Sequence, residues 1–135
     1  RGFTLIELMI VIVIVAILAA IAIPAFNEQI AKSRRANAKS VLVELVQCAE
    51  RFHTSNRTYV GFDAAANCNI AGNTDAFYVF ALNGAAAANA FSIRATPAGA
   101  QATDLCGTLQ VNQADQRRFS GTGTVNECQW GVQGL

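Results

Sequence analysis

Four cysteines are the side chains in this 135-residue sequence best suited to covalent chemistry. They form no CxxC pair, and the single histidine completes no usual zinc spacing, so we expect no metal site and no other cofactor. Four thiols permit three pairings. We expect Cys48 to pair with Cys68 and Cys106 with Cys128, because each pair is nearest in the proposed order of elements. Disulfides indicate an oxidising compartment; the alternative is four reduced thiols in a cytosolic domain, which a free-thiol count would detect.

The remaining polar residues are not spaced for catalysis. His53 has no serine or aspartate directly beside it and stands near a predicted helix end, so we expect a surface or capping residue. No GxSxG, HExxH or phosphate-binding glycine loop occurs. Arg94, Arg117 and Arg118 are candidate DNA contacts in one outward basic patch, the alternative being a scattered solvated surface. We therefore predict a protein that is not an enzyme.

The apolar residues are concentrated near the N-terminus. Hydrophobic residues make up 53% of the chain, its mean hydropathy is +0.31, and its net charge of +1 gives no overall field that would attract polyanions. Residues 8–23 contain no polar side chain, and with residues 3–6 they form a segment of about 21 residues, about 31 Å long as a helix. We expect residues 3–26 to form a helix able to cross a membrane and residues 27–135 to form a water-soluble domain.

Glu7 lies within this segment, and three interpretations of the segment compete. A cleaved secretory signal finds a small-x-small site at residues 20–22 but leaves the charge unexplained. A single-span anchor explains the length, yet a carboxylate costs about 2.5 to 3.5 kcal/mol in a membrane-spanning helix and less near its end. In a bundle of such helices, a free N-terminal amine on a neighbouring chain would pair with the carboxylate. Only this third interpretation gives Glu7 a role.

Residues 2–10, GFTLIELMI, followed by the aliphatic run and Pro24, resemble the class III signal of type IV pilins and of the pseudopilins of type II secretion. The resemblance implies that a prepilin peptidase cleaves between Gly2 and Phe3. It also implies that Phe3 becomes the N-methylated first residue and that residues 1–2 end the leader. Glu7 then stands at the family's charged position and Pro24 at its helix-kinking position. Phe3, Glu7 and Pro24 are therefore the expected assembly residues.

Cleavage would change the charge available to Glu7. It converts the Phe3 nitrogen from an uncharged amide into a cation, which would neutralise Glu7 of an adjacent subunit in an apolar medium. The β-branched run at residues 10–15 and Pro24 both lower helix propensity. We therefore expect residues 16–24 to be helical in a bilayer, which enforces helix, and partly unwound once the helices pack in a filament.

The water-soluble domain has the pattern of a helix followed by a small sheet. Residues 27–54 contain no Pro or Gly, and apolar residues recur at helical spacing at positions 38, 41, 42, 45, 48, 49 and 52. The opposite face is expected to be solvated and carries Lys32, Arg35, Lys39, Glu50 and Arg51.

A small sheet is expected after this helix. Residues 67–75 are expected to form a loop, and strands are expected at 77–82, 90–96, 105–111 and 116–120. In the second strand, alternation places Phe91, Ile93 and Ala95 toward the helix and Arg94 outward. The predicted fold class is α+β: the type IV pilin fold, with one long N-terminal helix, bent near Pro24, packed on a four-stranded antiparallel sheet.

The C-terminal half carries a second resemblance. The sequences TPAGAQ at 96–101, CGTL at 106–109 and GTVNEC at 123–128 are similar to PilE-like type IV pilins, including the ComP group of DNA-uptake minor pilins. The leading hypothesis is a structural subunit that waits in the inner membrane and polymerises into an extracellular filament for adhesion, twitching motility or DNA uptake. The alternatives are a minor pilin that acts as a DNA receptor and a type II secretion pseudopilin. The implied partners are other pilin subunits, the inner membrane, the prepilin peptidase and the assembly machinery, with DNA as a further candidate.

Overall fold

The computed structural model describes residues 2–68 and 74–135. The chain forms two compact units, Arg1–Ser33 and Arg34–Leu135, which we call the N-terminal unit and the C-terminal unit. This division lies somewhat beyond the expected boundary after Phe26. The helix α1 (Leu5–Asn56) provides the regular structure of the N-terminal unit and the first element of the C-terminal unit.

Within the C-terminal unit, α1 presents a buried apolar stripe to the rest of the fold. The residues that are at most 1% exposed follow the predicted helical spacing and are Ala38, Leu42, Leu45 and Ala49. The helix ends at Asn56, the last residue of the stretch 54–56 that the sequence favours as its stop. Arg57 follows in the left-handed region with a φ of 57°, and its N–H donates to the His53 carbonyl at 2.7 Å, a common way to end a helix.

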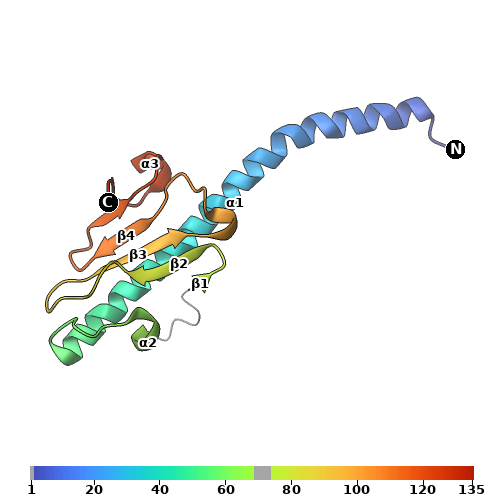
Figure 1. The fold of residues 1–135 in the computed structure, drawn as a ribbon. Helices are drawn as coiled ribbons and strands as arrows, with labels where there is room; N and C mark the ends of the chain where they lie inside the picture. Colours follow the sequence, from blue (N-terminus) through green and yellow to red (C-terminus); the bar gives the residue numbers. More distant parts are fainter. Residues whose placement is uncertain (1, 69–73) are drawn as a thin grey trace. The chain divides into compact units, whose positions relative to one another are not determined.

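The sheet packs on this part of α1, as Figure 1 shows. In the described residues it has six strands in sequence order: β1 (Thr74–Asp75), β2 (Tyr78–Leu82), β3 (Ser92–Pro97), β4 (Leu109–Asn112), β5 (Arg117–Phe119) and β6 (Val132–Gln133). Consecutive strands pair antiparallel up to β5, and β5 pairs parallel with β6. The short elements between the strands and before them are α2 (Ala64–Cys68), the 3-10 helix η1 (Gly99–Gln101) and α3 (Val125–Cys128).

The strand register sorts side chains onto two faces of the sheet. On the inner face, Ile93 of β3 lies opposite Val111 of β4, and both belong to the core that includes the α1 stripe. Arg94 lies opposite Gln110 and points to the outer face, away from this core. The alternation predicted for β3 is therefore confirmed. Trp130 completes the core, and its Nε1 donates to the Gln110 carbonyl at 3.0 Å.

The structure differs from the expected one in four respects, the first being that β6 pairs parallel with β5 whereas the predicted sheet is antiparallel throughout. The sequence predicts four strands, whereas the described residues form six, because β1 and β6 have two residues each and are too short to show alternation. Residues 105–108 are expected in a strand but form turns instead. Gly107 there has a φ of 59°, which excludes an extended strand, and its N–H donates to the Asp104 carbonyl at 2.9 Å. The expected loop at 67–75 begins inside α2, and residues 69–73 lie outside the described part.

Candidate functional site

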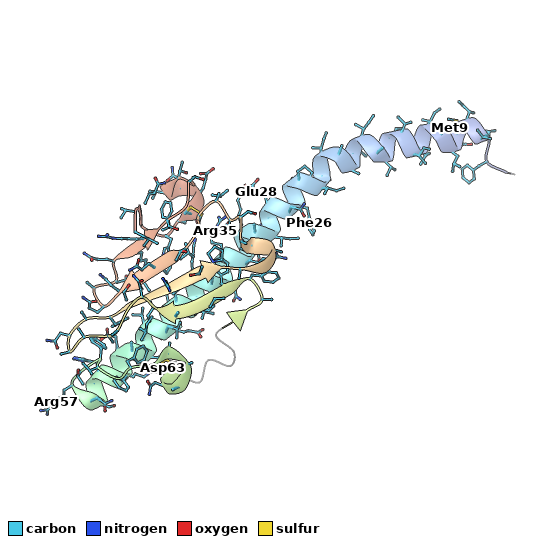
Figure 2. The ribbon with its side chains drawn as sticks, in the orientation of Figure 1. Met9, Phe26, Glu28, Arg35, Arg57 and Asp63 are labelled. Atoms are coloured by element: carbon cyan, nitrogen blue, oxygen red, sulfur yellow. A yellow bond between two sulfur atoms is a disulfide. The ribbon has the colours of Figure 1, made fainter. Side chains whose placement is uncertain are left out.

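The N-terminal unit exposes a continuous apolar surface. Large aliphatic side chains are exposed along α1, with Leu18 at 62% and Ile21 at 70%. Figure 2 shows these side chains projecting around the helix between Met9 and Phe26. Length and composition make α1 the one helix in the described residues able to cross a membrane. Surface of this kind is stable only in lipid or against other apolar helices.

Glu7 is the one acidic residue in the first turn of α1. The backbone N–H of Glu7 donates a hydrogen bond to Oγ1 of the Thr4 side chain at 3.3 Å. No cation of the described chain forms an ion pair with its carboxylate. The nearby Phe3 side chain is 87% exposed. The structure therefore leaves Glu7 available to a cation from outside this chain.

Pro24 lies inside the continuous helix α1. The expected unwinding of residues 16–24 refers to helices packed together, and in the single subunit this segment is helical. Proline removes one backbone donor and weakens the helix locally. The role of Pro24 in packing therefore remains a prediction.

A buried ion pair fastens α1 to the loops of the C-terminal unit. The guanidinium of Arg35 forms two hydrogen bonds with the carboxylate of Asp104, one of them from Nε to Oδ2 at 3.1 Å. The two side chains are only 4% and 1% exposed. The guanidinium also donates to the Glu127 carbonyl at 3.3 Å, and the Tyr78 hydroxyl donates to Asp104 Oδ2 at 3.3 Å. One cluster thus connects α1, β2, the turn before β4, and α3.

Burial and the charge of Asp104 together set the protonation states of Arg35 and Tyr78. Burial raises the pKa of the Tyr78 hydroxyl to about 12, and the negative charge of Asp104 adds to that rise. Burial by itself would lower the pKa of Arg35, but its hydrogen bonds and attraction to Asp104 outweigh that effect and hold the pKa above its usual value. The guanidinium and the phenol are therefore charged and neutral, respectively, throughout the physiological range.

Arg35 corrects one sequence prediction. The charge pattern of the sequence predicts Arg35 on the solvated face of the helix, but the residue is 3% exposed. Its position continues the buried stripe, since residues 35, 38, 42 and 45 are separated by helical steps of three and four. This spacing is the feature of the sequence that predicts a buried Arg35. No sequence pattern identifies Asp104 as its partner, because Asp104 lies 69 residues further along the chain.

Both predicted cysteine pairs are disulfides in the structure. Cys48–Cys68 joins α1 to α2, and Cys106–Cys128 joins the turn before β4 to α3. Their sequence separations are 20 and 22 residues. Closing a loop of that length is worth about 3 kcal/mol in the chain-entropy estimate. Each bond thus fixes a short α-helix, α2 or α3, which has few hydrogen bonds of its own.

The three candidate DNA-contacting arginines do not share one face, which corrects the predicted patch. Arg118 lies opposite Gln110 in the sheet, as does Arg94, so both project from the outer face. Arg117 is adjacent to Arg118 in β5 and therefore points to the other face. There it pairs with Asp115 at 3.0 Å and covers the Trp130 ring at 4.9 Å from the ring centroid. Only Arg94 and Arg118 remain together.

The described residues contain no group of three or more histidine, cysteine, aspartate or glutamate side chains that would hold a metal ion. His53 lies in the last turn of α1 and stacks on Tyr59, with ring centroids 4.3 Å apart. The Tyr59 hydroxyl donates to Glu50 Oε1 at 2.8 Å. His53 thus packs at a helix end, in agreement with the surface or capping role expected of it.

Two family models match the sequence. The model described as "Type IV minor pilin ComP, DNA uptake sequence receptor" matches residues 24–110, and the model described as "Prokaryotic N-terminal methylation motif" matches residues 1–23. Among curated proteins, a type IV major fimbrial protein FimA of Dichelobacter nodosus is 46% identical over 76 residues, covering 56% of this chain and 46% of that protein. The type IV major pilin protein PilA of Myxococcus xanthus is 48% identical over 62 residues, covering 46% of this chain and 28% of that protein. The match thus spans less than half the length of either relative.

Two solved structures have a similar fold. The non-core minor pilin PilV of Neisseria meningitidis superposes with a TM-score of 0.59 and 16% identity, covering 72% of this chain and 93% of that chain. A type IV pilin from Shewanella oneidensis superposes with a TM-score of 0.52 and 26% identity, covering 64% of this chain and 89% of that chain. Both support the predicted fold class of a long helix with an antiparallel-dominated sheet.

Proposed function

We propose a function on one premise: this chain belongs to the type IV pilin family described as "Type IV minor pilin ComP, DNA uptake sequence receptor", whose model covers residues 24–110. On that premise the chain is a structural subunit of a type IV pilus. The observation that carries the proposal is the apolar surface of α1, exposed to solvent in the single subunit and preceded by a matched N-terminal methylation motif.

The N-terminal unit supplies the means of assembly. In the inner membrane, lipid covers the apolar surface of α1. After cleavage between Gly2 and Phe3 and methylation of Phe3, the same surface packs on the helices of other subunits. Glu7 then pairs with the Phe3 amine of a neighbour, which removes the cost of an unpaired carboxylate in the filament core. The C-terminal unit faces outward and gives the extracellular filament its surface for adhesion, twitching motility or DNA uptake.

Sheared surface filaments provide the test of this function. We expect electron microscopy to show long fibres and mass spectrometry to identify this chain in them, with a mature N-terminus at N-methylated Phe3. The proportion of this chain in the fibres distinguishes a major from a minor subunit. Fibres that lack the chain altogether would contradict the proposal, and its confinement to the cell envelope without fibres would favour the pseudopilin alternative.

DNA capture is a second candidate function, favoured by the match to a family described as a DNA uptake sequence receptor. On this chain the cations suited to it are Arg94 and Arg118, which share the outer face of the sheet. Arg117 is not available in the same way, because Asp115 pairs with it.

Duplex binding at several salt concentrations tests DNA capture. We expect Arg94→Gln and Arg118→Gln each to weaken binding of a short DNA duplex and to reduce its salt dependence by about one released counterion. Arg117→Gln is the matched control and should have a smaller effect. Binding that is absent, or that does not change with salt, would remove this candidate.

A further inference from the structure

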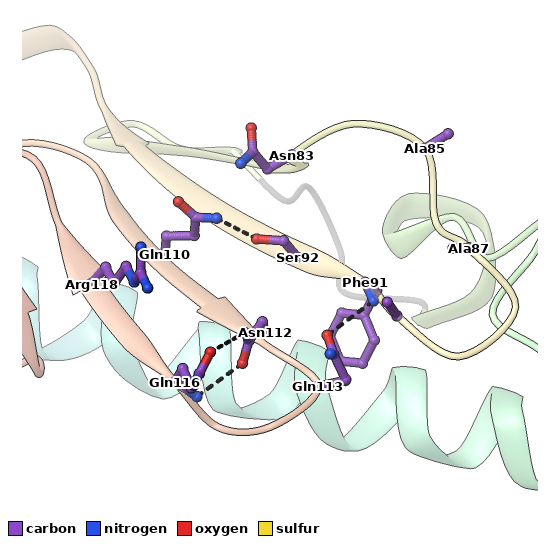
Figure 3. Close-up of a pocket in the computed structure, with 11 residues that line it drawn as sticks. Asn83, Ala85, Ala87, Phe91, Ser92, Gln110, Asn112, Gln113, Gln116 and Arg118 are labelled. Atoms are coloured by element: carbon purple, nitrogen blue, oxygen red, sulfur yellow. Dashed lines mark hydrogen bonds between the residues drawn. The ribbon is translucent and has the colours of Figure 1, made fainter. Parts of the chain in front are cut away.

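A polar groove crosses the outer face of the sheet beside Arg118. It has a volume of about 390 Å³, within the range of ligand-binding clefts. Figure 3 shows it between the β2–β3 loop, which carries Asn83 and Ala85, and the β4–β5 turn, which carries Gln113 and Gln116. The neutral polar side chains that line it are Asn83, Ser92, Gln110, Asn112, Gln113 and Gln116.

Hydrogen bonds within the chain hold the groove in shape. Gln110 Nε2 donates to Ser92 Oγ at 2.5 Å across β3 and β4, and Asn112 Nδ2 donates to Gln116 Oε1 at 2.8 Å across the β4–β5 turn. The Phe91 N–H donates to Gln113 Oε1 at 3.2 Å. Side chains fixed in this way lose little entropy when a ligand binds.

Several polar groups in the groove are left without partners. Within the described part of the chain, no hydrogen bond or ion pair engages the guanidinium of Arg118, the side-chain carbonyl oxygen of Gln110 or the side-chain amide nitrogen Nε2 of Gln116. None of the lining residues is acidic. The groove therefore offers hydrogen-bond donors, an acceptor and one uncompensated positive charge.

We propose that this groove binds a carboxylate-bearing sugar unit of an acidic oligosaccharide. A guanidinium matches the bidentate geometry of a carboxylate, so Arg118 would pair with the acid group. Side-chain amides both donate and accept hydrogen bonds, as sugar hydroxyls do, so Gln110 and Gln116 would bind the hydroxyls of the same unit. This binding goes beyond assembly, because a filament subunit does not require it.

Nucleic acid fits the groove less well than a sugar acid does. Single strands are held largely by bases stacked on aromatic rings, and Phe91, the aromatic residue of the groove, is only 4% exposed. Duplex DNA is held by many phosphate contacts, whereas Arg118 is the one cation among the lining residues. Arg94 is nearby on the same face but does not line the groove. This difference between the two arginines makes the proposal testable.

The test uses the full chain in detergent micelles and tetragalacturonic acid as the probe, with the fully methyl-esterified tetramer as its uncharged counterpart. Calorimetry measures affinity, and side-chain amide signals in nitrogen-15 NMR spectra report contacts at Gln110 and Gln116. We expect the acid to bind, the ester to bind about tenfold more weakly, and Arg118→Gln to weaken binding of the acid by about the same factor. Arg94→Gln, the matched control, should leave the affinity for the acid unchanged.

Four results would overturn the proposal. They are no binding of the acid at millimolar concentration, equal binding of acid and ester, unchanged affinity in Arg118→Gln, or an equal loss in Arg94→Gln and Arg118→Gln together with displacement of the probe by a short DNA duplex. The last result would assign the outer face to DNA. None of them bears on filament assembly, which is read from the fibres.

Discussion

Replacing Glu7 by alanine is expected to abolish incorporation of this chain into filaments while the C-terminal unit keeps its fold. Glu7 lies in the first turn of α1 and has no ion-pair partner in the described chain. In a filament core it would face the N-terminal amine of a neighbour. Without the carboxylate that amine is buried and unpaired, which costs about 3 to 5 kcal/mol for each subunit added. The yield of sheared fibres, quantified by mass spectrometry, measures the effect.

Two further variants separate charge from shape and position. Glu7→Gln keeps the size of the side chain but removes its charge, and we expect it to fail in assembly as Glu7→Ala does. Glu28→Ala is the matched control on the same helix, because Glu28 is exposed and pairs within the chain with Lys32 at 2.8 Å. It should assemble normally. Normal fibre yield from Glu7→Ala would refute the pairing of Glu7 with a terminal amine.

The elements that follow a simple period could be predicted from the sequence. The buried stripe of α1 and the alternation in β3 are both visible as spacing of apolar residues. The disulfides follow from order along the chain, since each bond joins two cysteines that are consecutive in the sequence. By contrast, β1 and β6 form only because longer strands present an edge to them, so no local pattern marks them.

The arginines show where reading by residue type misleads. Arg117 and Arg118 are adjacent in a predicted strand, and that prediction already implies opposite faces, although the charge pattern suggested one patch. Arg35 is charged, yet its position belongs to the apolar stripe. Its partner and the groove beside Arg118 depend on loops brought together by the whole fold, and no spacing in the sequence foretells them.

Replacing Arg35 by alanine is expected to lower the free energy of unfolding of the C-terminal unit by about 3 to 5 kcal/mol. The substitution leaves the Asp104 carboxylate buried, with Tyr78 as its remaining donor among the interactions described. It also removes the donor to the Glu127 carbonyl. Urea unfolding of the full chain in detergent, followed by the near-ultraviolet signal of Trp130, measures the loss because Trp130 lies in the same core.

A double variant shows whether the loss comes from the stranded charge. Arg35→Met with Asp104→Leu removes both charges and fills the space with apolar atoms, so we expect it to recover most of the stability. Arg117→Ala is the matched control, because its pair with Asp115 is largely exposed, and it should cost at most about 1 kcal/mol. If Arg35→Ala cost no more than Arg117→Ala, the buried pair would not be what fastens α1 to the turn before β4. The orientation of the sheet on residues 34–56 of α1 would then be set by the apolar stripe alone.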